Sequence, residues 1–166
     1  MHLLQTRNAD MLKVEIEDTE DAKSHLILRL ENKNIYDDNG NIIYDSTKYP
    51  IQQFPDFPDT VNPYLWQISK DNAFAGILKM TDGHYCAYGI DIAVIGFIKS
   101  DHGWIIVDCG NYIESATTAL KLAEKAIGEN IHDNIKAVNY SHSHLDHYGG
   151  AEAFVTKEKV GKIEDG

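Results

Sequence analysis

The side chains best suited to chemistry lie together in residues 139–150, whose sequence is NYSHSHLDHYGG. A nearly extended segment would point His142 and His144 to the same side, so that two imidazoles can bind one metal ion. Asp146 and His147 follow about one turn later and can face a neighbouring position that suits a second ion. We therefore predict a metal site with these four side chains among its ligands.

The chemistry of such a site is hydrolysis. Two divalent ions about 4 Å apart share a water, lower its pKa and generate hydroxide near neutral pH. Imidazole together with carboxylate favours zinc, with iron or manganese as alternatives. A single loop histidine usually faces solvent, but four potential ligands in the order HxHxDH indicate a metal-dependent hydrolase. Gly149 and Gly150 follow, and their lack of a β-carbon predicts a tight bend into a helix near Ala151.

A strand, a helix and a second strand are expected to position this segment. β-Branched residues predict strands near 92–99, 103–108 and 135–140, and ILKMTDGHYCAYG is also strand-like. Apolar residues at helical spacing predict a helix near 114–127 that Gly128 terminates. This βαβ unit predicts a shared sheet, with the histidines at the carboxyl end of its last strand, where α/β proteins build sites.

Residues 1–70 are polar and acidic and are predicted to form an amino-terminal arm, with residues 71–166 as the body. Within the arm, an Asn39-Gly40 turn in IYDDNGNIIYD predicts a hairpin. Prolines between residues 52 and 63 predict an irregular connection.

The formal net charge of −11 argues against nucleic acid as a partner. No apolar run is long enough to span a membrane, and the first residues do not resemble a signal peptide. A cytoplasmic location is therefore expected, with a secreted or periplasmic one as the alternative if the start of the chain is incomplete. Cys86 and Cys109 form no ligand pattern and are expected to be buried thiols.

The SHSHLDH stretch resembles the metal-binding motif of the metallo-β-lactamase fold, an αββα sandwich. Residues 60–109 are similar to the amino-terminal part of linear alkylsulfatases. Family stretches NPSLW, GLF-VTDGIYQVRGYDLAN and GWIVIDP correspond here to NPYLW, GILKMTDGHYCAYGIDIAV and GWIIVDC. The resemblance implies an α/β fold: a partial metallo-β-lactamase-like sandwich with an irregular amino-terminal arm and one apolar, exposed sheet face.

Carried over residue by residue, the resemblance implies that His142 and His144 hold a first zinc, and that Asp146 and His147 hold a second. Asp146 is the implied catalytic residue, which also orients the metal-bound hydroxide. Asp108 is implied to order the histidine loop through hydrogen bonds, and a plain turn-forming aspartate is the alternative. Tyr64, Trp66 and Trp104 suggest either a groove for an apolar tail or core packing.

In the family, two glutamate ligands, a further histidine, the sulfate-holding residues and a dimerisation domain lie downstream of the motif. The resemblance therefore implies the amino-terminal fragment of a homodimeric zinc alkylsulfatase that hydrolyses sulfate esters of long-chain alcohols, such as dodecyl sulfate. The fragment alone is expected to bind zinc weakly and to be inactive. Two alternatives remain: a hydrolase of this fold acting on thioesters, lactones or phosphodiesters, and a non-catalytic remnant.

Overall fold

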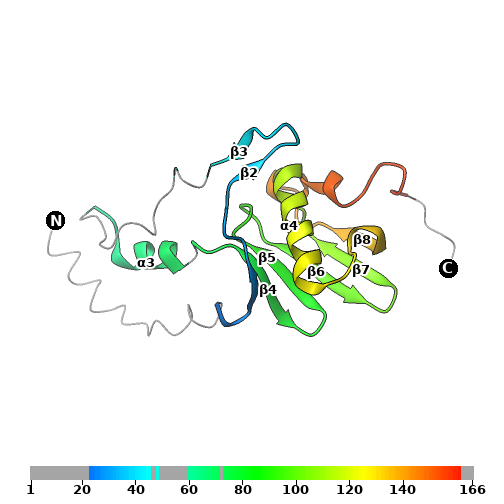
Figure 1. The fold of residues 1–166 in the computed structure, drawn as a ribbon, viewed down its shortest axis with the longest axis horizontal. Helices are drawn as coiled ribbons and strands as arrows, with labels where there is room; N and C mark the ends of the chain where they lie inside the picture. Colours follow the sequence, from blue (N-terminus) through cyan, green and yellow to red (C-terminus); the bar gives the residue numbers. More distant parts are fainter. Residues whose placement is uncertain (1–22, 46–47, 49–59, 72, 162–166) are drawn as a thin grey trace.

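The computed structural model describes residues 23–45, 48, 60–71 and 73–161 (Figure 1). A six-stranded mixed sheet with the order β1-β4-β5-β6-β7-β8 forms its centre. The strands are β1 (Leu26–Arg29), β4 (Gly76–Thr81), β5 (His84–Tyr88), β6 (Ile95–Ser100), β7 (Gly103–Val107) and β8 (Ile135–Asn139). All neighbouring strands are antiparallel except β7 and β8, which are parallel.

The predicted βαβ unit is confirmed. The chain runs from β7 through helix α4 (Ile113–Ile127) and the short 3-10 helix η3 (His132–Asn134) into β8. A parallel pair requires such a crossover, because the chain must return to the starting edge before the second strand begins. Both strands therefore end at the same edge of the sheet, where the histidine segment follows β8.

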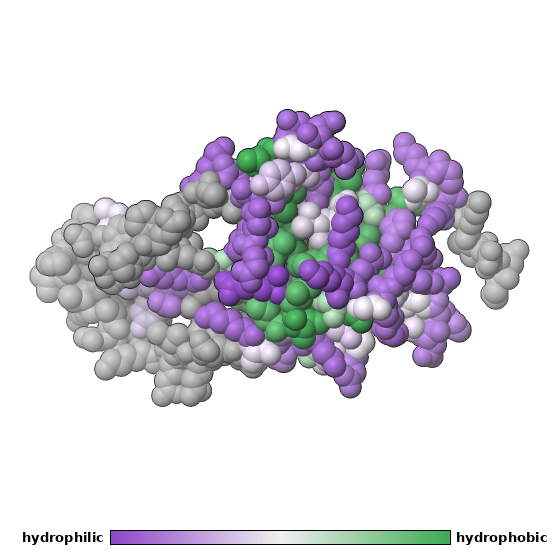
Figure 2. Space-filling model, in the orientation of Figure 1, coloured by the Kyte–Doolittle hydropathy of each residue, from purple (hydrophilic) through white to green (hydrophobic). Residues whose placement is uncertain are grey.

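Helix α4 packs against one face of the sheet (Figure 1). The predicted helical spacing is confirmed by the residues that it buries, Ser115, Ala116, Ala119, Leu120 and Ala123. Three of the five are alanines, which let the helix approach the strands closely. The sheet contributes Ile77, Ile95, Phe97, Trp104 and Ile106, among others. Figure 2 shows hydrophobic residues gathered over the middle of this body, with hydrophilic residues around them. Trp104 is 2% exposed, which assigns it to core packing and not to an open groove.

Gly128 ends α4 in the left-handed region, with φ 77° and ψ 23°, and its N–H donates to the carbonyl of Glu124. An added β-carbon would meet nothing within 4 Å, so only the conformational cost separates glycine from alanine here. We expect Gly128→Ala to lower the free energy of unfolding by about 1 kcal/mol in urea titrations. Gly128→Asn should lie between the two, since asparagine tolerates this conformation. An alanine variant as stable as the original would contradict this explanation.

The amino-terminal residues contribute more to the body than the sequence predicted. The hairpin is confirmed as β2 (Ile35–Tyr36) and β3 (Ile42–Tyr44), and Ile35 is buried in the main core. Strand β1 also joins the main sheet, because it pairs with β4. This four-residue strand has little periodicity of its own, so its place is set by its partner.

The predicted irregular connection lies mostly outside the described residues. Its last residue, Pro63, begins helix α3 (Pro63–Asp71), which was not predicted. Proline is well suited to a first helical position, because the N–H that it lacks has no partner within the helix. Among the described residues, no helix is both long and apolar enough to cross a membrane.

The sheet face opposite α4 is also largely apolar. Pairing across β5, β6 and β7 places Cys86, Gly96 and Val107 in one row, and His84, Ile98 and Ile105 in the next. His84 is exposed and the other five residues are partly exposed. The face is therefore apolar apart from His84, and its apolar residues are half-buried where full exposure was expected.

Candidate metal centre

The histidine segment leaves β8 at the edge of the sheet and turns into α5 (Leu145–Tyr148), which is followed by the 3-10 helix η4 (Ala151–Ala153). His144 is the last extended residue before α5, with φ −79° and ψ 148°. Asp146 and His147 lie within the helical turn that follows. His142 and His144 therefore precede the helical turn, and Asp146 and His147 lie within it.

The four predicted ligands converge as two pairs. His142 Nε2 lies 3.0 Å from His144 Nδ1, and His147 Nε2 lies 3.3 Å from Asp146 Oδ2. The rings of His142 and His147 have centroids 3.9 Å apart, so the two pairs are neighbours. His142 and His144 are exposed, whereas Asp146 and His147 are half-buried.

Asp108 anchors this segment from the end of β7. Its carboxylate accepts hydrogen bonds from the Ser141 N–H at 2.8 Å, from the Ser141 hydroxyl at 2.8 Å and from His147 Nδ1 at 2.8 Å. Burial alone would raise the pKa of this carboxyl, but the hydrogen bonds from Ser141 and His147 outweigh burial and hold its pKa below the ordinary value. Asp108 therefore offers an ionised acceptor to both residues.

These hydrogen bonds assign the ring protons of two histidines. His147 Nδ1–H donates to Asp108, which leaves the lone pair of a neutral ring on Nε2, facing Asp146. Because the Ser141 hydroxyl donates to Asp108, its oxygen can accept from His142 Nδ1, 3.0 Å away. That leaves the lone pair of His142 on Nε2, facing His144. The contacts of the Ser141 hydroxyl with His142 and His147 were not predicted from the sequence.

The geometry of each pair fits a metal ion. Two ligands of a tetrahedral zinc at its usual bond lengths lie roughly 3.3 Å apart. The separations of 3.0 and 3.3 Å are close to this value. Among the described residues, no three His, Cys, Asp or Glu side chains are grouped so as to hold one ion. The four side chains therefore lie as two neighbouring pairs, and their role as metal ligands stays a prediction.

Gly149 and Gly150 are needed for a different reason from the one expected. Their φ angles of −58° and −88° are available to any residue, so no glycine-specific bend occurs. A β-carbon added at Gly149 would instead lie 2.3 Å from the carbonyl oxygen of Asn111. A β-carbon added at Gly150 would lie 2.2 Å from the carbonyl oxygen of Cys109. The glycines let the histidine segment lie directly against the turn between β7 and α4.

Cys109 lies beside the predicted ligands but is poorly suited to join them. Its side chain is fully buried in the hydrophobic core. Burial, and to a lesser extent the charge of Asp108, raises the pKa of the thiol to about 12. Because a metal binds the thiolate, the protonated thiol of Cys109 is expected to serve only in packing. Its backbone N–H does contact the segment, with a 2.8 Å hydrogen bond to the His147 carbonyl.

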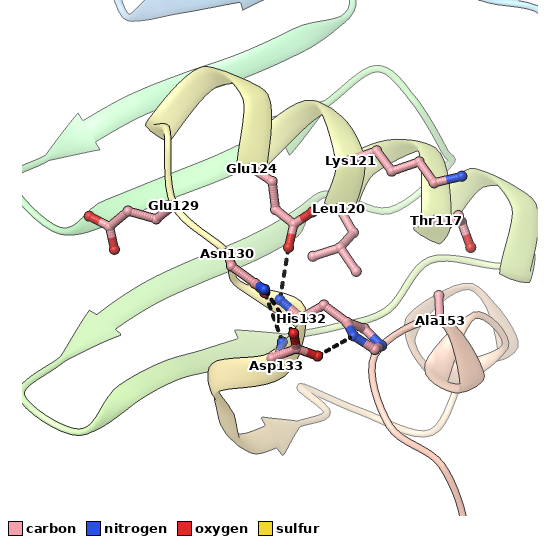
Figure 3. A pocket seen from close by; sticks show the side chains of 9 residues that line it. All are labelled: Thr117, Leu120, Lys121, Glu124, Glu129, Asn130, His132, Asp133 and Ala153. Atoms are coloured by element: carbon pink, nitrogen blue, oxygen red, sulfur yellow. Dashed lines mark hydrogen bonds and ion pairs between the residues drawn. The ribbon is translucent and has the colours of Figure 1, made fainter.

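A separate pocket of about 500 Å³ lies beside α4 and the chain that follows it (Figure 3). Glu124 Oε1 accepts from the N–H groups of Ile131 and His132, and Asn130 donates to Asp133. These polar groups satisfy one another and close the turn before β8. The pocket contains none of the predicted ligands, so we assign it a structural role.

Comparison with known proteins gives the segment a family context. Residues 88–165 match the family model described as the metallo-β-lactamase superfamily. The chain is 33% identical over 164 residues to an (R)-specific secondary-alkylsulfatase of Pseudomonas sp., covering 95% of this chain and 24% of that protein. It is 34% identical over 146 residues to a linear primary-alkylsulfatase of Pseudomonas sp., covering 86% of this chain and 21% of that protein.

Solved structures agree. The stereoselective inverting sec-alkylsulfatase Pisa1 from Pseudomonas sp. superposes with a TM-score of 0.79 at 31% identity, covering 96% of this chain and 25% of that one. The chain thus matches the fold of part of that alkylsulfatase, as the sequence predicted. The chain spans less than a quarter of the length of these two curated relatives. Residues 88–165 are thus similar to the metallo-β-lactamase superfamily, and the homologues of the chain over most of its length are alkylsulfatases.

Proposed function

We propose that this chain supplies the first metal ligands of a zinc-dependent alkylsulfatase that hydrolyses sulfate esters of long-chain alcohols, such as dodecyl sulfate. The observation that carries the proposal is the convergence of two donor pairs, His142 with His144 and Asp146 with His147, in a chain whose homologues are alkylsulfatases. Zinc bound to such donors acts as a Lewis acid that lowers the pKa of a water at the site.

The residues of this chain would hold and orient the reacting groups. Asp108 keeps His147 turned so that Nε2 faces Asp146, and Ser141 does the same for Nε2 of His142. Asp146 brings negative charge to the second pair, and its other oxygen can accept a hydrogen bond from a water. Holding these groups before the substrate arrives reduces the reorganisation that the reaction requires.

Exposed apolar side chains beside the ligands support an alkyl ester as the substrate. Tyr140 is 45% exposed, Leu145 56% and Tyr148 43%, and the rings of the two tyrosines lie 6.3 Å apart. All three flank the predicted ligands in the sequence. A hydrocarbon chain lying against them would bury apolar surface of the chain and of these side chains. This burial contributes about 25 cal/mol of binding free energy per Å².

The proposal is tested by joining residues 1–155 to the carboxyl-terminal part of a related alkylsulfatase. We expect this chimera to release sulfate from dodecyl sulfate in the presence of zinc, and to lose that activity when the metal is removed by a chelator. The 166-residue chain alone serves as the baseline, for which negligible release is expected. S-lactoylglutathione is the control substrate, because a thioester hydrolase of this fold would cleave it. A folded, zinc-loaded chimera that cleaves only the thioester would contradict the sulfatase assignment.

A further inference from the structure

Asp91 lies in the connection between β5 and β6, outside the four predicted ligands and their partner Asp108. One of its oxygens, Oδ2, accepts a hydrogen bond from the Asn111 N–H at 2.9 Å and another from the hydroxyl of Ser115. Its Oδ1 accepts from the N–H of Ile92 at 2.6 Å. Ser115 is 3% exposed, so the contact is made inside the protein. Asp91 therefore ties the β5–β6 connection to the beginning of α4.

The turn that Asp91 holds, residues 108–112, is the surface against which the histidine segment lies. The Cys109 N–H donates to the His147 carbonyl at 2.8 Å, and the Gly150 N–H donates to the Gly110 carbonyl at 3.1 Å. The same turn presents the Asp108 carboxylate to Ser141 and His147. A displacement of this turn would therefore move the ligands.

The turn contains two residues with unusual backbone conformations. Asp108 has a φ of 60° and Gly110 a φ of 73°, so two left-handed residues occur within three positions. For aspartate this conformation costs free energy that the surroundings must offset. Tyr112, at the N-cap of α4, makes no capping hydrogen bond with its side chain. The carboxylate of Asp91 is placed to supply both needs, because it accepts from the turn and brings negative charge to the amino-terminal end of α4.

We propose that Asp91 is a positioning residue of the metal site, which acts on His142, His144, Asp146 and His147 through the 108–112 turn. This inference rests on the proposed function where it concerns metal binding, but its structural part does not. The alternative is that Asp91 only stabilises α4. The two differ in one respect: a positioning residue changes the bonds between the turn and the histidine segment, and a general stabiliser does not.

The 166-residue chain offers a matched control at the other end of the same helix. Glu124 also accepts two backbone N–H groups, those of Ile131 and His132, in the chain that precedes β8. Glu124→Gln therefore weakens a comparable contact between a side chain of α4 and the backbone of a neighbouring segment. Both variants would be studied at a temperature where circular dichroism shows them fully folded.

The first measurement needs no metal. Amide hydrogen exchange, followed by NMR, reports on the Cys109 and Gly150 N–H groups that join the turn to the segment. We expect Asp91→Ala to speed exchange at both by about tenfold, since local opening becomes easier. Asp91→Asn keeps an acceptor oxygen and should recover part of the protection. Glu124→Gln should leave both rates within about twofold of the original and speed exchange at Ile131 and His132 instead.

The second measurement is calorimetric titration with zinc alone. We expect Asp91→Ala to weaken zinc binding by about tenfold, the lower end of the effect seen when the support of a ligand is lost. Glu124→Gln should bind zinc as the original does. If the original chain takes up no zinc at the four ligands, the proposed function fails while the exchange result still decides the role of Asp91.

Unchanged exchange at Cys109 and Gly150 in Asp91→Ala would overturn the inference, as would an equal change in Glu124→Gln. If Asp91→Ala does not fold, Asp91→Asn takes its place, because it removes the charge and keeps one acceptor oxygen for Asn111. It should speed exchange at the same two amides by a smaller factor, and unchanged rates there would overturn the inference equally.

Discussion

Replacing Asp146 by alanine is expected to abolish zinc-dependent sulfate release by the chimera described above. The substitution removes the only carboxylate of the second donor pair and leaves His147 Nε2 without the oxygen that lies 3.3 Å away. Removing a residue that only supports a ligand typically lowers metal affinity or activity by about 10–100-fold. Removing the ligand itself should therefore lower activity by more than about 100-fold. Initial rates of sulfate release from dodecyl sulfate, measured at saturating zinc, check this expectation.

Two variants define the specificity of that result. Ser143→Ala changes an exposed residue between the two histidines of the first pair and should keep activity within about twofold, as is usual for surface substitutions. Asp146→Asn keeps the size of the side chain and removes its charge, so it should resemble the alanine variant. An Asp146→Ala chimera that retains most of its activity would exclude Asp146 as a ligand that the reaction needs.

The fold around the site could be predicted because its signals are local. Strands β6, β7 and β8 are short runs rich in β-branched residues, and α4 repeats its alanines at helical spacing. Gly128 ends the helix as expected, because a left-handed C-cap strongly favours glycine. The position of the histidine segment then follows from topology, since parallel strands β7 and β8 end at one edge of the sheet.

The contacts that hold the segment in place could not be predicted, because they join residues distant in the sequence. Asp91 reaches Ser115, and Asp108 reaches Ser141 and His147, across 24, 33 and 39 positions. A single aspartate has no periodic pattern that would reveal its partner. Gly149 and Gly150 show the same limit: the sequence indicated that small residues were needed, but only the structure gives the backbone contact that requires them.

Strand β1 illustrates how pairing decides structure where the local signal is weak. Leu26 and Leu28 pair with Leu78 and Ile77 of β4, so the sheet recruits a segment that the sequence assigned to an irregular arm. β-Propensity depends strongly on the partner strand, and four residues carry little of it alone. The same dependence explains why the two-stranded hairpin, with its clear turn signal, was the easier prediction.

The first donor pair gives the second large effect: His142→Ala together with His144→Ala should eliminate zinc uptake at one position of the 166-residue chain. The reason is geometric, since the two ring nitrogens 3.0 Å apart are the donors that the described residues offer to that position. Calorimetric titration of the original chain should show zinc binding that is weaker than at completed sites, because the chain supplies two ligands per ion where three or four are usual.

The matched control for the histidine variant is the double substitution His84→Ala, His102→Ala. Both of these imidazoles are exposed. His84 is the first residue of β5 and His102 lies between β6 and β7, so both are outside the histidine segment. The control removes the same number of imidazoles, so it separates specific binding from the general affinity of surface histidines for zinc. Its zinc uptake should equal that of the original chain. Equal uptake by the original chain and by the His142→Ala, His144→Ala variant would show that the first pair is not a metal site, and would leave Asp146 and His147 to be tested alone.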